Sequence, residues 1–264
     1  MNQPPRALVD THVHLDAAPL DASSFTRARE AGVVSAIAVG VSPAGWSRTI
    51  DIARAAGVSH ALGIHPQVVP DLDDHAIDDA IARLPSLLRE SGAVGIGECG
   101  LDAPAGDLER QRRVLFAHLE IARSMHLPIS LHVWKAHGAA VALLRDFGVL
   151  PAGGVAHSYS GSAELVRDYL DRGLCISFAG GITRSNAKKP ILAARAVPHD
   201  RLVIETDAPY QPAGPDARDR DHGEPRDLAT ILEALAAARG DDADTLAAQT
   251  TANARRIFRL GATP

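Results

Sequence analysis

Two histidines separated by one residue, His12 and His14, close the first apolar run of the chain, ALVDTHVHLDA (residues 7–17). Side chains two residues apart in a β-strand point to the same face, so both imidazoles would converge on one point. Neutral imidazole is a common ligand of divalent metal ions such as zinc, manganese, nickel and iron. The pair therefore predicts part of a metal site, provided that other segments supply further ligands.

Further ligands do stand at the ends of other apolar runs. Counting the opening pair, five histidines and two carboxylates occupy such positions: His12, His14, His65, Glu98, His132, His157 and Asp207. A carboxylate that ends an apolar strand is costly to bury unless it is paired or binds a metal. Even without His65, which need not be a ligand, four histidines and two carboxylates exceed the four ligands of one tetrahedral zinc ion. The set therefore predicts two divalent cations, Zn²⁺, Mn²⁺ or Mg²⁺, about 3.5–4 Å apart. Some barrel hydrolases with two metals bridge them with a carboxylated lysine. Because the fourth apolar run contains no lysine, Glu98 is the expected bridging ligand.

The elements that must position these ligands alternate regularly. Short apolar runs occur at about residues 7–13, 34–40, 59–64, 93–97, 128–133, 153–157, 174–178 and 201–206. Stretches with helical spacing, such as 109–125 and 162–173, lie between most of them. Apolar runs with little polar alternation are typical of strands covered on both faces. Eight strand–helix units in about 250 residues predict an α/β fold, a (β/α)8 TIM barrel, in which the carboxyl ends of all strands share one face.

The alternative is a doubly wound open sheet, which often carries a glycine-rich nucleotide loop after its first strand. Here the first run ends in His-x-His-x-Asp instead, which favours the barrel. Residues 242–261 predict an extra C-terminal helix. We expect one barrel domain over residues 1–264.

Composition narrows the function classes. A net charge of −5 argues against a protein that coats nucleic acid through a large basic face. The two cysteines argue against a disulfide framework and fit a reducing compartment. The first ten residues show no signal-peptide pattern, and no run approaches the roughly 18 apolar residues of a membrane span. We therefore expect a cytoplasmic protein without a membrane partner, most simply a monomer.

The same residues lie in motifs that resemble those of the TatD-family metal-dependent hydrolases, amidohydrolase-like barrels best known for deoxyribonucleases. The similarity runs from about residue 8 to 258, through DTHVHLD, LGIHP, VGIGECGLD, LPISLH, AHSYSGS, ISFAGG, ETDAPY and TTANARRIF. The resemblance implies a first metal held by His12, His14, Glu98 and Asp207, and a second held by Glu98, His132 and His157. It also implies metal-dependent phosphodiester hydrolysis, often 3′–5′ exonuclease action on single-stranded DNA.

Three residues are the expected catalytic groups. Two bridged cations would activate a water molecule, with Glu98 as the bridge, and Asp207 would orient that water and accept its proton. His65 would donate to a substrate oxygen or leaving group. Glu205, two residues before Asp207, is expected to contact a ligand or to pair with an arginine.

Candidate substrate contacts lie just beyond the strand ends. Arg184, Lys188 and Lys189 follow the seventh strand, where barrel enzymes commonly hold phosphate. Trp134, Tyr159 and Tyr210 could stack on the bases of single-stranded DNA.

The sequence departs from the usual family pattern at Val133–Lys135, Ser158–Tyr159 and Gly223–Pro225, while the expected metal ligands are intact. Two alternatives to a nuclease therefore stay open. One is a hydrolase of a small lactone, amide or ester on the same metal pair. The other is a non-catalytic partner-binding barrel with structural metals.

Overall fold

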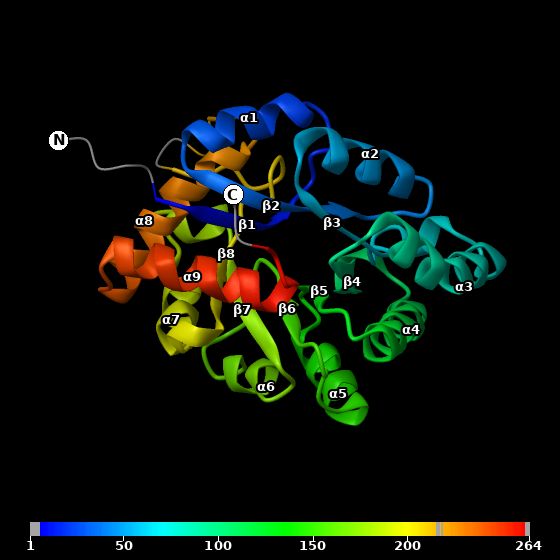
Figure 1. Cartoon of the computed structure of the whole chain (residues 1–264). Helices are drawn as coiled ribbons and strands as arrows, with labels where there is room; N and C mark the ends of the chain where they lie inside the picture. Colours follow the sequence, from blue (N-terminus) through cyan, green and yellow to red (C-terminus); the bar gives the residue numbers. More distant parts are fainter. Residues whose placement is uncertain (1–5, 215–216, 218, 262–264) are drawn as a thin grey trace.

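The computed structural model describes residues 6–214, 217 and 219–261. Residues 1–5, 215–216, 218 and 262–264 lie outside the described residues. The expected domain, residues 1–264, and the segment considered for a signal peptide therefore extend beyond what the structure describes. Eight parallel strands form one sheet in the order of the sequence, with the helices around it (Figure 1). The strands are β1 Leu8–Val13, β2 Val33–Gly40, β3 Ser59–Leu62, β4 Gly95–Asp102, β5 Ile129–Trp134, β6 Gly154–Ala156, β7 Leu174–Phe178 and β8 Leu202–Ile204.

The sheet curls into a near-closed barrel. Beyond the last residues of β8, the backbone amide of Asp207 donates to the carbonyl of His12 at 2.9 Å. The amide of His14 donates to the carbonyl of Ala208, also at 2.9 Å. These bonds join the two edge strands next to two predicted ligands. The predicted (β/α)8 barrel is confirmed.

The helices alternate with the strands and lie on the outside of the barrel. They are α1 Ala22–Glu30, α2 Trp46–Ala56, α3 Asp74–Ser91, α4 Leu108–Met125, α5 His137–Phe147, α6 Val166–Leu170, α7 Lys188–Ala196, α8 Leu228–Arg239 and α9 Ala243–Phe258. Short 3-10 turns cover Val69–Asp71, Ala103–Ala105, Gly180–Thr183, His199–Arg201 and Pro225–Asp227. Aspartate side chains cap the first turns of four helices, where backbone amides lack partners; they are Asp21, Asp73, Asp107 and Asp242.

The C-terminal helix α9 is the predicted extra helix, and it packs where the strands begin. Thr251 donates its hydroxyl to the carbonyl of Ala7 at 2.7 Å, just before β1. Asn253 donates its amide to the carbonyls of His199 and Leu202, at the start of β8. In Figure 1, α9 crosses in front of β8, β7 and β6. The helix therefore covers the end of the barrel opposite to the carboxyl ends of the strands.

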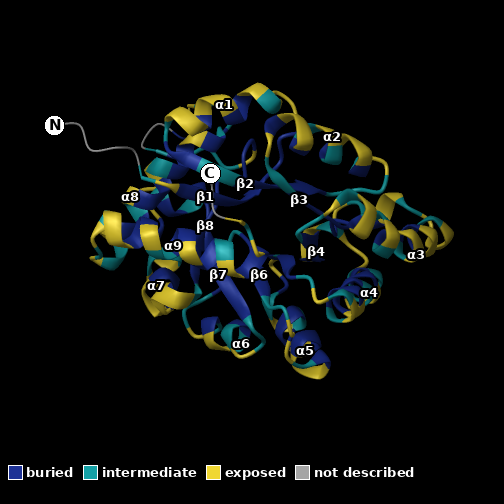
Figure 2. Cartoon of the chain, viewed as in Figure 1, coloured by how far each residue is buried: buried dark blue, intermediate teal, exposed yellow. Residues whose placement is uncertain are grey.

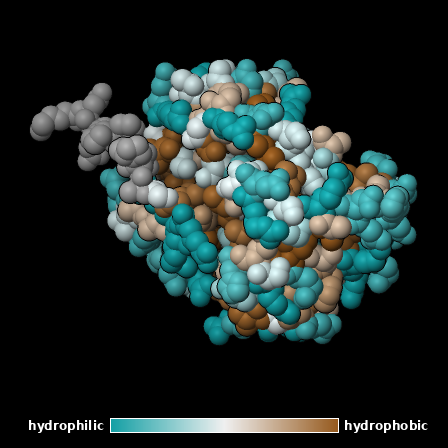
Figure 3. Space-filling view, turned by 45° about the vertical axis from the view of Figure 1, so that its right-hand side comes forward, coloured by the Kyte–Doolittle hydropathy of each residue, from teal (hydrophilic) through white to brown (hydrophobic). Residues whose placement is uncertain are grey.

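The strands are buried along nearly their whole length, and exposure is concentrated on the outer faces of the helices (Figure 2). This distribution explains why the strands read as apolar runs without alternation. The surface in Figure 3 mixes hydrophilic and hydrophobic residues. Within the described part of the chain, no helix has both the length and the apolar character needed to cross a bilayer.

Two elements differ most from the sequence-based expectation. Strand β4 continues to Asp102, beyond the apolar run 93–97, because Cys99 and Leu101 keep it buried past Glu98. Helix α6 covers only Val166–Leu170 of the expected 162–173. The longer β4 matters for function, since it brings a second carboxylate to the rim.

Candidate metal centre

All seven predicted strand-end residues lie at the same rim of the barrel. His12 belongs to β1, Glu98 to β4 and His132 to β5. The other four follow directly or closely after a strand: His14, His65, His157 and Asp207. Six of the seven are buried, and His132 is partly buried. The structure thus brings together every residue that the sequence analysis placed at the metal pair.

The first group of donor atoms surrounds one oxygen of Glu98. His12 Nε2 lies 3.2 Å from Glu98 Oε2 and 3.1 Å from His14 Nε2. His14 Nε2 lies 3.5 Å from the same oxygen and 3.3 Å from Asp207 Oδ1. Ligand atoms about 2.1 Å from a tetrahedral ion are about 3.4 Å apart, so these four side chains have the spacing of one metal site.

The second group surrounds the other oxygen of Glu98. Oε1 lies 2.8 Å from His132 Nδ1, 3.1 Å from His157 Nε2 and 3.2 Å from His65 Nε2. The two oxygens of one carboxylate therefore face two different sets of nitrogens. This is the arrangement expected of a carboxylate that bridges two cations.

Hydrogen bonds on the outer ring nitrogens fix the tautomers of two candidate ligands. His14 Nδ1 lies 3.1 Å from the carbonyl of Val39, and His157 Nδ1 lies 3.0 Å from Glu205 Oε1. Because a carbonyl or a carboxylate can only accept, each Nδ1 carries the proton, and each Nε2 keeps its lone pair for a metal. His12 Nδ1 is paired with the hydroxyl of Ser130 at 2.9 Å.

His65 has the opposite tautomer. Its Nδ1 accepts a hydrogen bond from the backbone amide of Gln67 at 3.1 Å, so the proton of the neutral ring is on Nε2. An Nε2–H group is a hydrogen-bond donor and has no lone pair for a metal. His65 therefore reaches the second group with a donor, which suits a contact with a substrate oxygen better than a metal bond.

Asp102 is a residue that the sequence analysis missed. Its Oδ2 accepts from the amide of Gln67 at 2.8 Å and lies 3.4 Å from His132 Nε2. His132 Nε2 and Asp102 Oδ1 are buried without a hydrogen-bond partner among the described residues. A small adjustment would let His132 donate to Asp102 and turn its Nδ1 lone pair to a metal. The available signal was the position of Asp102, four residues after Glu98 and thus on the same face of the strand.

Glu205 is fully buried behind His157. Its carboxylate accepts from His157 Nδ1, from the backbone amide of Ser158 and from the hydroxyl of Thr11. Glu205 therefore contacts a candidate ligand rather than an arginine. His12, His157 and Glu205 could be read as a third metal group. We interpret them as a hydrogen-bonded network, because His157 meets Glu205 through Nδ1, and its ring stacks on that of His12 with centroids 3.8 Å apart.

The electrostatics of the site favour added positive charge. Burial alone would lower the pKa of His157, but the carboxylates of Glu98, Glu205 and Asp207 raise it well above its usual value. Burial alone would raise the pKa of Glu98, but the surrounding histidines, first among them His65 and His157, hold it well below its usual value. Protons or metal ions can supply such charge, and two cations on four nitrogens and two carboxylates would satisfy it without protonating the rings.

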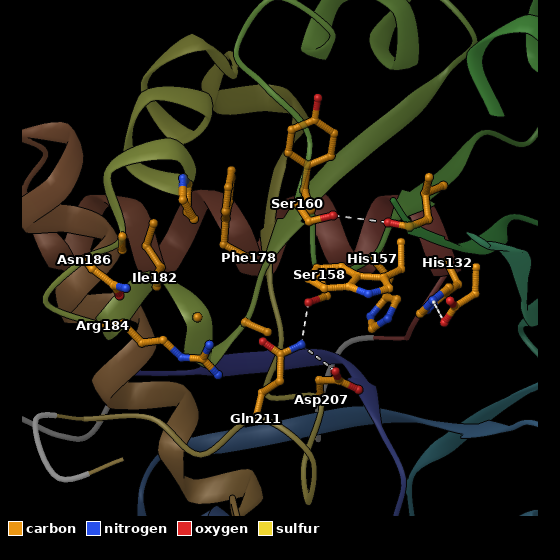
Figure 4. A pocket seen from close by; sticks show the side chains of 18 of the residues that line it. His132, His157, Ser158, Ser160, Phe178, Ile182, Arg184, Asn186, Asp207 and Gln211 are labelled. Atoms are coloured by element: carbon orange, nitrogen blue, oxygen red, sulfur yellow. Dashed lines mark hydrogen bonds and ion pairs between the residues drawn. The ribbon is translucent and has the colours of Figure 1, made fainter. Parts of the chain in front are cut away.

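The candidate substrate residues fall into two sets around a cavity of about 460 Å³ beside the second group (Figure 4). Trp134, Tyr159 and Arg184 line this cavity. Tyr159 is almost fully buried and donates its hydroxyl to the carbonyl of Ser162 at 2.8 Å, so its ring is only part of the wall. Lys188 starts helix α7 and does not line the cavity, nor does Lys189.

Two further residues complete the rim. Tyr210 is 64% exposed, and its ring lies 5.2 Å from that of His14. Gln211, which the sequence analysis did not single out, donates its amide to Asp207 Oδ2 at 2.7 Å and also contacts the hydroxyl of Ser158 (Figure 4). Gln211 therefore holds the outer oxygen of Asp207 while Oδ1 faces the histidines. No motif in the sequence indicates this contact, since it depends on the path of the loop after β8.

Comparisons with known proteins agree with this geometry. Residues 9–259 match the family model described as TatD related DNase. The chain is 30% identical to the uncharacterised metal-dependent hydrolase YabD of Bacillus subtilis, over 96% of this chain and 99% of that protein. It is 34% identical to the 3′-5′ ssDNA/RNA exonuclease TatD of Cronobacter sakazakii, over 91% of this chain and 92% of that protein.

Among solved structures, the crystal structure of YjjV, a TatD homologue from Escherichia coli K12, superimposes with a TM-score of 0.88. It is 28% identical in sequence, and the match covers 96% of this chain and 98% of that one. Both the fold and the sequence are thus shared over nearly the whole length. The chain belongs to the TatD family of metal-dependent hydrolases, with an amidohydrolase-like fold.

Proposed function

We propose that this protein is a two-metal phosphodiesterase that shortens single-stranded nucleic acid from its 3′ end. The observation that carries the proposal is the position of Glu98, whose two oxygens face two separate groups of histidines and carboxylate. The name of the Cronobacter relative, a 3′-5′ ssDNA/RNA exonuclease, supports the choice of substrate. The first ion would be held by His12, His14, Glu98 and Asp207, and the second by Glu98, His132 and His157.

Two divalent cations bound there would lower the pKa of a water molecule and neutralise charge on the phosphoryl oxygens. Asp207 would orient the attacking water and take its proton. Its orientation is fixed from outside, because Gln211 donates to Oδ2. His65 would donate its Nε2 proton to a substrate oxygen, in keeping with the amide of Gln67 on its Nδ1.

The decisive experiment combines metal analysis with a substrate panel. The purified protein is stripped, reloaded with Zn²⁺, Mn²⁺ or Mg²⁺, and tested on end-labelled single-stranded DNA, on RNA and on small lactones and amides. We expect stepwise shortening of the 3′ end, with Glu98→Gln losing both activity and one or both bound ions. Rapid turnover of a small ester or lactone with inert nucleic acid would contradict the proposal, and so would full metal occupancy without any turnover.

A further inference from the structure

The cavity beside the second group of ligands has room for a part of the substrate next to the bond that is cut. It shares His132, His157 and Asp207 with the candidate metal centre and extends from there towards the segment after β7. Its volume of about 460 Å³ lies in the range of about 300–1,000 Å³ of pockets that hold small organic molecules. A substrate group attached to the scissile phosphate therefore has a defined space to enter.

Arg184 is the one arginine or lysine among the described residues that line this cavity. It follows the 3-10 turn Gly180–Thr183, and Figure 4 shows its guanidinium directed inward, towards Gln211. Many arginines of this chain are paired with carboxylates, as Arg110 is with Asp74. No described residue forms an ion pair or a side-chain hydrogen bond with Arg184. A guanidinium that has no such partner among the described residues, at the wall of a substrate cavity, is well suited to a phosphate, which it can bind with two parallel hydrogen bonds.

The wall between Arg184 and the metal centre is mainly apolar and aromatic. Trp134, Phe178 and Ile182 contribute it, and Trp134 is 45% exposed. Asn186 and Gln211 add amide groups. Apolar and aromatic surface with a few polar groups suits a nucleoside, whose base can stack and whose sugar and base edges need hydrogen bonds.

A second cavity, of about 350 Å³, opens on the other side of the same ligands. It also contains His132, His157 and Asp207, and its far wall includes His65, Val68 and Tyr210. The candidate metal centre thus lies where the two cavities meet, at His132, His157 and Asp207, and this junction is called the seam. A phosphodiester at the seam would place one of its two nucleosides in each.

We propose that Arg184 binds the phosphate one nucleoside away from the phosphodiester that is cut, and that this nucleoside fills the 460 Å³ cavity. The inference rests on the proposed function and refines its substrate class. The 3′-terminal nucleoside of an exonuclease substrate ends in a free hydroxyl and offers no further phosphate. The nucleoside beside Arg184 is therefore the penultimate one, with its 3′ oxygen at the seam and its 5′ phosphate on the guanidinium.

Thymidine dinucleotides test this assignment. TpT, pTpT with a 5′ phosphate and TpTp with a 3′ phosphate contain the same scissile bond. We expect the 5′ phosphate to raise kcat/KM by about tenfold or more, the range of one charge-assisted phosphate contact. Arg184→Ala should reduce that gain to less than about twofold, and Arg184→Lys should keep part of it, since lysine retains the charge without the bidentate geometry. Arg83→Ala, which removes an exposed arginine of helix α3, should keep the full gain.

An equal gain in the wild type and in Arg184→Ala would overturn the inference. A gain from the 3′ phosphate of TpTp alone would overturn the orientation. Bis(p-nitrophenyl) phosphate, which has no second phosphate, reports separately on the proposed function. If it is hydrolysed and pTpT is not preferred, the inference fails and the proposed function stands.

Binding can be measured without turnover. Trp134 lines the cavity, whereas the other tryptophan, Trp46, is buried, donates its indole N–H to the carbonyl of Gly63 and does not line the cavity. Thymidine 3′,5′-bisphosphate added to the metal-stripped protein should therefore change tryptophan fluorescence with saturation, and the change should be lost in Trp134→Phe. In Arg184→Ala the affinity should fall by about tenfold or more. Unchanged affinity would overturn the role of Arg184 even if no phosphodiester were cleaved.

Discussion

Replacing Glu205 by glutamine should loosen one of the two metal sites and leave the other intact. Glu205 is fully buried and accepts from His157 Nδ1 at 3.0 Å, from the amide of Ser158 and from the hydroxyl of Thr11 at 3.1 Å. Glutamine has the same shape, and its carbonyl oxygen can still accept from His157 and Ser158. The hydroxyl of Thr11 can turn to the carbonyl of Ile204, 3.1 Å away. The fold should therefore survive.

The charge, however, is lost, so the hydrogen bond that holds His157 in the tautomer with a free Nε2 becomes weaker. Loss of such a partner behind a metal-binding histidine typically weakens metal affinity by about 10–100-fold, or roughly 1.4–2.7 kcal/mol. Glu205→Ala is the harsher variant. It leaves the donors of His157 and Ser158 without an acceptor in a buried site, at about 1–3 kcal/mol each, which is a large fraction of the whole stability of a domain. Glutamine is therefore the informative replacement.

The assay is a competition titration of the metal-stripped protein against a chromophoric chelator, which resolves the two binding steps. Ser130→Ala is the matched control, because Ser130 contacts Nδ1 of His12 in the first group. Glu205→Gln should weaken one step, and Ser130→Ala the other. Two unchanged steps in Glu205→Gln, or the same step weakened in both variants, would refute the assignment of His157 and His12 to different ions.

Three further predictions concern the surroundings of the site. Burial lowers the pKa of His118 from 6.5 to about 4, so its contribution to stability is complete above about pH 6.5 and falls by roughly 2 kcal/mol at pH 5. Chemical denaturation of the metal-free protein should show that the difference in unfolding free energy between wild type and His118→Gln narrows by that amount between these pH values. A constant difference would exclude His118 as the origin of the pH dependence. Gln211→Leu removes the donor to Asp207 Oδ2, so kcat on bis(p-nitrophenyl) phosphate should drop about 5–10-fold at unchanged metal content, as one hydrogen bond is worth about 1–1.5 kcal/mol; loss of metal instead would show that Gln211 supports binding rather than orientation. Asp102→Asn should weaken one metal-binding step by about 10-fold or more, because His132 loses an ionised neighbour. Calorimetry of metal binding measures this affinity, and an unchanged value would show that Asp102 only stabilises the fold.

The strand-end residues could be found from the sequence because barrel topology does most of the positioning. A parallel barrel carries the carboxyl end of every strand to one rim, so an apolar run followed by His65 or Asp207 already implies convergence. The period of two in a strand places His12 and His14 on one side for the same reason. Neither inference depends on loop conformation.

Contacts made by loops and by long side chains were beyond the sequence. Gln211 reaches Asp207 only because the segment after β8 turns back over the rim. Lys188 and Arg184 are four residues apart in one basic segment, but only Arg184 lines the cavity, and the residue types do not show which of the two does. Asp102 was hidden by the end of the apolar run, since β4 continues beyond the residues whose hydrophobicity marked it.

The most direct test of the account is an anomalous diffraction measurement on crystals of the protein loaded with Mn²⁺ or Zn²⁺. It should locate two ions about 3.5–4 Å apart, each bonded to a different oxygen of Glu98, with His14 and Asp207 on one ion and His132 on the other. A single ion, or two ions that do not share Glu98, would contradict the account.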